Sequence, residues 1–274
     1  MYHFLNGNIL PESEASILIN DLSILRGYGI FDYLRTYKKK PFLLKKYLSR
    51  FFNSASIAGL PVPYDSSEIE IIIKRLICLS PYDELGIRLV LTGGYSFDAY
   101  TMVKPNFFIL AEKFNAPPQK DFNLGVNILS YQYQRDFTEA KLLNYSSSII
   151  FNSRNAQKKA AEILYHYQGR ISEASRSNFF VVYDDRLITA GEHILKGITR
   201  DSVLSLAQGH FNVEETNFPF DRLSLVDEAF ITSTTKGIMP VIKIDDLIIG
   251  NGTVGKSTAH LIQLYNDFVQ KWEQ

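Results

Sequence analysis

The chain has 274 residues, more than a usual single domain, so we expect two domains; an apolar fraction of 46% can fill their cores. Its 29 basic and 29 acidic side chains cancel, which argues against a polyanion or a charged membrane surface as a partner. One cysteine, Cys78, excludes an intrachain disulfide, and its apolar surroundings predict a buried, inert thiol. No apolar stretch approaches the roughly 20 residues that span a bilayer, and the first residues do not resemble a signal peptide. The expected location is the cytoplasm.

The N-terminal part predicts a small α+β domain. Asn6-Gly7 is typical of a hairpin turn, and the β-rich run 30–37 predicts a strand. From Leu44 the apolar residues follow a helical stripe that stops at Gly59. The other expected elements are a helix over residues 66–80 and strands over 87–92 and 107–111.

Consecutive prolines mark the expected domain boundary. The segment Asn115-Ala-Pro-Pro-Gln-Lys120 resists both helix and central strand, so we take 115–120 as a linker between domains 1–114 and 121–274. The second domain mixes both element types, which makes the chain an α/β (α+β) protein. Its expected strands are 126–129, 179–182, 229–232 and 241–244, and its expected helices are 145–158, 199–208 and 256–272.

Three segments of the second domain carry the groups that a pyridoxal phosphate enzyme needs: Lys141-Leu-Leu-Asn-Tyr145, Ile171-Ser-Glu-Ala-Ser-Arg-Ser-Asn178 and Gly197-Ile-Thr-Arg200. An amine can hold the aldehyde as a Schiff base, a carboxylate can pair with the ring nitrogen, and a loop entering a helix can bind phosphate. Their order, with Arg50 upstream and Thr234-Thr235 downstream, resembles the fold-type IV class of pyridoxal phosphate enzymes. That class contains branched-chain and D-amino acid aminotransferases and aminodeoxychorismate lyase.

The resemblance assigns the two chemical groups of the cofactor site. Lys141 matches the Schiff-base lysine, although a lysine seen in isolation is ordinarily a solvent-facing residue. The Lys-x-x-Asn spacing is similar to that of the D-amino acid and lyase branches, and Tyr145 matches the tyrosine whose phenol contacts the ring hydroxyl. Glu173, in a segment similar to the family's G-x-[IV]-x-E-x-x-x-x-N-[IL]-F, matches the carboxylate at the pyridine nitrogen.

The resemblance also implies three places that bind the cofactor phosphate. Ile198 and Thr199 stand at the start of an expected helix, whose free N–H groups attract an anion, and a simple threonine cap is compatible with this role. Thr234 occupies the contacting position of a second phosphate loop. Arg50 is the third phosphate-binding residue, because its segment is similar to the family's H-x-x-R-L-x-x-S-A. In this chain Tyr47 replaces the His and Phe51 replaces the Leu, while Ser54 and Ala55 match the motif.

The residues expected at the substrate follow from the same resemblance: Phe31, Arg35, Arg88, Tyr95 and Thr235. Arg35 and Arg88 match arginines that branched-chain enzymes use near the substrate carboxylate, but both can equally be salt-bridged residues of strands. D-amino acid enzymes carry Thr-Arg-Gly at the end of the strand that holds Arg88. This chain has Thr92-Gly93-Gly94 there, which argues against D-alanine specificity.

The family's properties give the expected function. The resemblance implies a small α+β N-terminal domain, a larger C-terminal domain with a barrel-like sheet, the cofactor between them, and a homodimer. We expect transfer of an amino group between an amino acid, branched-chain or another aliphatic L-amino acid, and a 2-keto acid. Aminodeoxychorismate lyase, which forms p-aminobenzoate and pyruvate, is the alternative, and a catalytically silent member is a further one.

One motif points to a different class of protein. Gly250-Asn-Gly-Thr-Val-Gly-Lys-Ser257 satisfies the P-loop pattern of nucleotide-binding proteins. Too little chain follows Ser257 to form the several βα units of such a domain, so nucleotide binding is a remote alternative. The five histidines have none of the short spacings of a zinc site, so we expect no metal.

Overall fold

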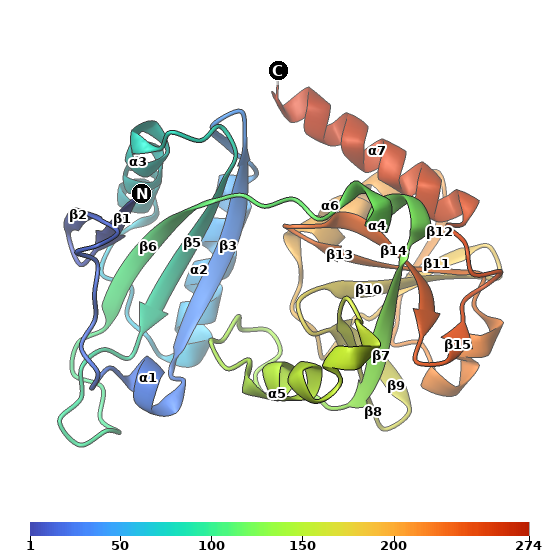
Figure 1. Cartoon of the computed structure of the whole chain (residues 1–274), viewed down its shortest axis with the longest axis horizontal. Helices are drawn as coiled ribbons and strands as arrows, with labels where there is room; N and C mark the ends of the chain where they lie inside the picture. Colours follow the sequence, from blue (N-terminus) through green and yellow to red (C-terminus); the bar gives the residue numbers. More distant parts are fainter. Residues whose placement is uncertain (274) are drawn as a thin grey trace. The chain divides into compact units, whose positions relative to one another are not determined.

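The computed structural model describes residues 1–273, and the chain forms two compact units (Figure 1). Unit 1 contains residues 1–115 and 140–145, and unit 2 contains residues 116–139 and 146–272. This division differs from the predicted domains in that the segment around Lys141 belongs to unit 1. The predicted linker also differs, because helix α4 (Gln119–Leu124) begins inside it.

Unit 1 is built on an antiparallel sheet with the strand order β2-β1-β6-β5-β3-β4. The predicted hairpin is confirmed, since Asn6 and Gly7, both with positive φ, connect its first two strands. The strands are β1 (Tyr2–Leu5), β2 (Asn8–Pro11), β3 (Gly29–Tyr37), β4 (Lys40–Pro41), β5 (Leu85–Thr92) and β6 (Asn106–Lys113). A short helix, α1 (Leu22–Arg26), precedes β3.

Two predicted helices of unit 1 are confirmed and pack against its sheet (Figure 1). Helix α2 (Leu44–Ala58) buries the predicted apolar stripe and ends at Gly59. Helix α3 (Ser66–Leu79) begins with a capping box between Asp65 and Glu68. Cys78 is exposed, so the predicted buried thiol is wrong. Its neighbours Leu76 and Ile77 complete the buried face of α3, and Cys78 falls on the opposite side.

Unit 2 contains a nine-stranded sheet that curls into a barrel-like form. Strands follow one another in the order β10-β13-β14-β7-β8-β9, and β9 pairs again with β10, which closes the path. Strands β11 and β12 extend the sheet beyond β10, and β15 pairs with β14. The strands are β7 (Val126–Gln132), β8 (Ile163–Tyr167), β9 (Arg170–Ala174), β10 (Asn178–Tyr183), β11 (Arg186–Thr189), β12 (Asn212–Glu215), β13 (Glu228–Ser233), β14 (Gly237–Ile244) and β15 (Leu247–Ile248).

The helices expected in unit 2 are present with slightly different bounds. They are α5 (Ser146–Arg154), followed by a 3-10 turn (Ala156–Lys158), α6 (Ile198–Ala207) and α7 (Lys256–Glu273); a second 3-10 turn covers Phe220–Leu225. No helix within residues 1–273 combines the length and the apolar character needed to cross a membrane.

Candidate active site

Lys141 is fixed to unit 1 by its backbone. Residues 141–143 lie beside the start of β3, where the N–H of Phe31 donates to the carbonyl of Lys141 and the N–H of Leu143 donates to the carbonyl of Gly29, both at 2.9 Å. The N–H of Lys141 donates to the Ser54 hydroxyl of α2 at 3.1 Å. A strand and a helix therefore hold the Lys141 backbone together.

The Lys141 amine lies over an aromatic ring. Its Nζ is 4.6 Å from the ring centroid of Phe31, and the side chain is half-buried. Tyr145 meets the same ring edge-on, with 5.6 Å between the centroids. The structure thus brings together Lys141, Tyr145 and Phe31.

Arg50 is largely buried and is paired with a carboxylate that the sequence analysis did not identify. Its Nε donates to Asp32 Oδ2 at 2.9 Å, and an NH2 group donates to Oδ1 at 2.6 Å. Burial disfavours the Arg50 charge, but Asp32 outweighs this effect and holds the pKa of Arg50 above its usual value, with smaller contributions from Tyr47 and Tyr145. The only sequence signal for Asp32 is a carboxylate within the buried alternation of β3, between Ile30 and Leu34.

The structure brings only one of the two predicted substrate arginines near Phe31. Arg88 lies opposite Tyr33 and has its guanidinium 5.8 Å from the Phe31 centroid, with an ion pair to Glu112 at 3.2 Å. Arg35 is four residues further along β3, roughly 13 Å away at the rise of a strand. It pairs with Glu84 at 2.7 Å and covers the Phe114 ring. These contacts give Arg35 a structural role.

The turn after β5 leaves the sheet at the same end as Lys141, because Thr92 lies opposite Gly29. Tyr95 follows in this turn and forms a bridge with Asp21. At Gly93 there is no room for a side chain: a Cβ would lie 2.5 Å from Tyr28 Cδ1 and 2.9 Å from a methyl group of Leu22. The Tyr28 ring is held by its hydroxyl, which donates to a backbone carbonyl of α2 at 2.8 Å.

The Ser54 contact gives a direct test of how Lys141 is held. Ser54→Ala removes one backbone partner of Lys141, worth about 1 kcal/mol, so the amide hydrogen exchange of residues 141–143 should accelerate several-fold. Ser56→Ala, on the exposed side of the same helix, is the matched control and should leave this exchange unchanged. Equal exchange in both variants would show that Ser54 does not hold the segment.

In unit 2, a row of polar side chains crosses three strands. Asn178 on β10 lies directly opposite Glu173 on β9 and Thr232 on β13, so the three side chains project from one face of the sheet. The backbone of Leu195, in the loop before α6, is hydrogen-bonded to Glu173 and Asn178. The N–H of Leu195 donates to Glu173 Oε2 at 3.0 Å, and the amide of Asn178 donates to the Leu195 carbonyl at 2.7 Å. Glu173 therefore lies on a strand beside the loop that leads into α6.

Arg135 holds the other oxygen of Glu173, and the sequence analysis missed it. Its Nε donates to Glu173 Oε1 at 2.8 Å, and its NH2 group lies 2.7 Å from the same oxygen. The NH2 group also donates to the Thr138 carbonyl at 2.8 Å. Both partners are largely buried, so this is a charge-assisted pair shielded from water. No motif marks Arg135 in the sequence.

The start of helix α6 is shaped to receive an anion. Its cap residue is Gly197, which provides no side-chain cap, and a Cβ there would lie 2.1 Å from Asn178 Oδ1. Ile198 and Thr199 form the first turn and are buried. The helix packs against β13, whose end leads into Thr234 and Thr235. Two of the predicted phosphate-binding segments, Ile198-Thr199 and Thr234-Thr235, are thus both connected to strand β13, the first through the packing of α6 and the second through the chain.

These residues fit pyridoxal phosphate. An uncapped helix start favours an anion such as phosphate, and a buried carboxylate held by Arg135 and Leu195 can face a protonated ring nitrogen. The hydroxyl of Thr232 is buried and has no hydrogen-bond partner within residues 1–273, which leaves a donor for an external group. In the next turn, the Thr235 hydroxyl lies 3.3 Å from that of Ser233.

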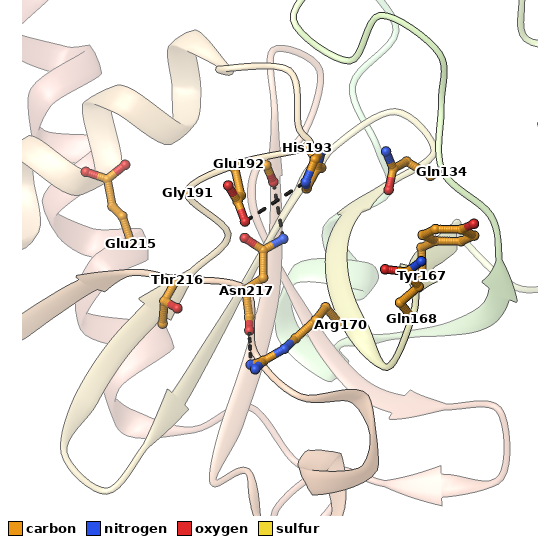
Figure 2. A pocket seen from close by; sticks show the side chains of 10 residues that line it. All are labelled: Gln134, Tyr167, Gln168, Arg170, Gly191, Glu192, His193, Glu215, Thr216 and Asn217. Atoms are coloured by element: carbon orange, nitrogen blue, oxygen red, sulfur yellow. Dashed lines mark hydrogen bonds and ion pairs between the residues drawn. The ribbon is translucent and has the colours of Figure 1, made fainter.

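A polar cavity of about 720 Å³ opens elsewhere in unit 2 (Figure 2). Arg170, His193 and Asn217 are among its lining residues, and no predicted site residue is. The amide of Asn217 donates to the carbonyls of Ile171 at 3.0 Å and Glu192 at 3.2 Å. The cavity wall therefore supports the loop that leads to Leu195.

The P-loop-like segment is occupied by a side chain of the protein itself. The N–H groups of Ser257 and Thr258, at the start of α7, donate to the Glu228 carboxylate at 3.0 and 2.7 Å. A Cβ at Gly255 would overlap the same carboxylate. Glu228 thus fills the place that a nucleotide phosphate takes in a P-loop, which argues against nucleotide binding here.

The Glu228 carboxylate caps the start of α7, and removing it should weaken the fold without creating a nucleotide site. Glu228→Ala should lower the free energy of unfolding by about 1–2 kcal/mol, measured by urea unfolding, because α7 loses a charged cap. Asp246→Ala, whose carboxylate is exposed, is the control and should change it by less than about 0.5 kcal/mol. ATP binding that Lys256→Ala abolishes would contradict this assignment.

Comparisons with known proteins agree on one family. The family model described as amino-transferase class IV matches residues 29–244. A D-alanine aminotransferase of Staphylococcus haemolyticus is 26% identical over 97% of each chain. A putative branched-chain-amino-acid aminotransferase of Methanocaldococcus jannaschii is 30% identical over 98% of this chain and 96% of that protein. A solved branched-chain aminotransferase of Thermoproteus uzoniensis with norvaline has a TM-score of 0.87 and 26% identity, covering 98% and 94% of the two chains. Another solved branched-chain amino acid aminotransferase, with pyridoxamine 5′-phosphate, has a TM-score of 0.89 and 27% identity, covering 97% and 93%.

Proposed function

We propose that this chain, which belongs to the class IV aminotransferase family, transfers the amino group of an aliphatic L-amino acid, branched-chain ones included, to a 2-keto acid. Enzymes of this family depend on pyridoxal 5′-phosphate. The observation that carries the proposal is the Lys141 amine, held 4.6 Å from the Phe31 ring centroid beside Tyr145 by a backbone that two elements fix.

When bound, the cofactor supplies an aldehyde that takes up the amino group and a ring that withdraws electrons. We propose that Lys141 holds the cofactor covalently and then, as a free amine, moves the proton of the substrate α-carbon. With the cofactor bound, the Tyr145 phenol would contact the ring hydroxyl, and Glu173 would keep the ring nitrogen protonated. The phosphate is assigned to Ile198, Thr199, Thr234 and Arg50.

The neighbours of these groups support the assignments. Arg135 and the N–H of Leu195 occupy both oxygens of Glu173, which fixes the position of the carboxylate. Asp32 takes Nε and one NH2 group of Arg50, so the remaining NH1 group is the one left for an anion in this assignment.

The preference for an L-amino acid rests on the turn after β5. The arginine that D-amino acid enzymes carry in Thr-Arg-Gly corresponds to Gly93, where Tyr28 and Leu22 leave no room for a side chain. Arg88 instead lies beside Phe31 and is the arginine we assign to the substrate carboxylate. Phe31, Tyr95 and Thr235 complete the proposed substrate site, with the aromatic rings against an aliphatic side chain.

A cytoplasmic homodimer is part of the proposal, as the family resemblance implies. Unit 1 exposes large apolar side chains to a degree that a second copy of the chain would relieve. Leu18 is 61% exposed, Ile19 85%, Phe97 84% and Tyr100 84%.

Replacing Lys141 tests the catalytic assignment. Lys141→Ala should lower the transamination rate by at least about 10³-fold, because it removes both the covalent link and the proton carrier. The variant should still bind the cofactor without a covalent bond. Lys243→Ala, at a partly exposed lysine that pairs with Asp246, should keep the wild-type rate. A Lys141→Ala enzyme as fast as the wild type would contradict the assignment.

The amino donor can be identified from the absorption of the bound cofactor. Titration of the purified holoenzyme with L-leucine, L-isoleucine or L-valine should remove the absorption band of the lysine-bound cofactor, and D-alanine should leave it. Conversion of D-alanine would reverse the assigned hand of the substrate. Release of p-aminobenzoate from aminodeoxychorismate would favour the lyase instead.

A further inference from the structure

A buried ion pair in unit 2 has no place in the proposed chemistry. Lys236 Nζ lies 2.5 Å from Glu162 Oε1, and the exposed fractions of the two side chains are 12% and 0%. The Ser177 hydroxyl donates to the same oxygen at 2.7 Å, and the N–H of Arg176 donates to the other at 3.0 Å. Every oxygen of this carboxylate is therefore engaged.

The pair joins two segments of the proposed cofactor site. Arg176 and Ser177 form the turn between Glu173 and Asn178. Lys236 belongs to the turn between β13 and β14, which carries Thr234 and Thr235. Glu162, just before β8, lies where these two turns meet.

The pKa of Glu162 stays low despite its burial. Burial alone would raise the pKa of Glu162, but Lys236 foremost, then Arg176 and Ser177, together hold it below its usual value. A buried ion pair is a poor way to gain stability, because desolvation offsets much of the attraction. A positioning role explains its presence better than stability does.

The two turns depend on this pair to different degrees. Glu173 is held independently by Arg135 and Leu195. The contacts of the turn of Thr234 and Thr235 include the strand pairing of Ser233 with Gly237, one backbone hydrogen bond from Lys236 to Ser233, and the contact between the Ser233 and Thr235 hydroxyls. The Lys236 amine adds the ion pair that ties this turn to Glu162. Loss of the pair should therefore affect this turn first.

We propose that Glu162 and Lys236 are positioning residues that hold the Thr234-Thr235 turn for the phosphate of the cofactor, so that the pair sets affinity for the phosphate and not for the ring. The inference rests on the proposed role of Thr234 in phosphate binding. Lys236 acts through the turn and Glu162 acts through Lys236.

Comparing pyridoxal 5′-phosphate with pyridoxal, which lacks the phosphate, tests this. In apo-protein prepared from the holoenzyme, Lys236→Met should weaken binding of pyridoxal 5′-phosphate roughly tenfold, and binding of pyridoxal should be unchanged. Absorption titration measures both affinities. Lys243→Met, on strand β14, which begins directly after Lys236, is the matched control and should alter neither affinity, because Lys243 pairs with the exposed Asp246.

A second variant guards against loss of folding. Glu162→Gln alone leaves a buried cation without its carboxylate and is expected to unfold readily. The double variant Glu162→Gln/Lys236→Met removes both charges, and it should fold and show the same tenfold loss as Lys236→Met, because the two residues act as one unit. Thermal unfolding of each apo-protein confirms that it is folded.

Different results would contradict the positioning role of the Glu162–Lys236 pair and the proposed function. An unchanged ratio of the two affinities in folded Lys236→Met and in the double variant would overturn the positioning role. Equal weakening of both ligands would also overturn it, since that is the result of a general structural defect. Failure of the wild-type protein to bind pyridoxal 5′-phosphate at all would overturn the proposed function itself.

Discussion

The backbone pairing of residues 141–143 with residues 29–31 is the constraint on which the proposed site depends. It makes the position of Lys141 a property of unit 1, although the chain on both sides of this segment belongs to unit 2. The same short stretch of β3 serves two purposes. Phe31 lies under the amine, and Asp32, on the opposite face of the strand, holds Arg50. A single strand thus positions both the Lys141 amine and the largely buried guanidinium of Arg50.

In unit 2, the pairing of β9 with β10 positions the proposed site residues. Pairing of Glu173 with Asn178 completes the barrel-like sheet, and both side chains then fix Leu195 in the loop before α6. The carboxylate assigned to the ring nitrogen and the helix start assigned to the phosphate are therefore built on one set of hydrogen bonds. A disturbance of this closure would reach both.

Local sequence patterns predicted much of the fold. The Asn6-Gly7 hairpin, the apolar stripe of α2 and the helix starting near Thr199 were recognisable because their signals lie within a few residues. Cys78 shows the limit of this approach. An apolar run indicated burial, but the helix turned this residue outward.

The partners of the site residues were not predictable in the same way. Arg135 holds Glu173 from 38 residues away, and Lys236 reaches Glu162 across 74 residues. Such pairs depend on strand order, which local patterns do not contain. The motifs singled out Lys141 and Glu173 as candidates, whereas their contacts, and the place of Lys141 in unit 1, required the structure.

Chemical trapping tests the role of Lys141 most directly. Borohydride reduction of the holoenzyme, followed by peptide mass mapping, should place a phosphopyridoxyl group on the peptide that contains Lys141. A label on any other lysine, or no label at all, would contradict the account.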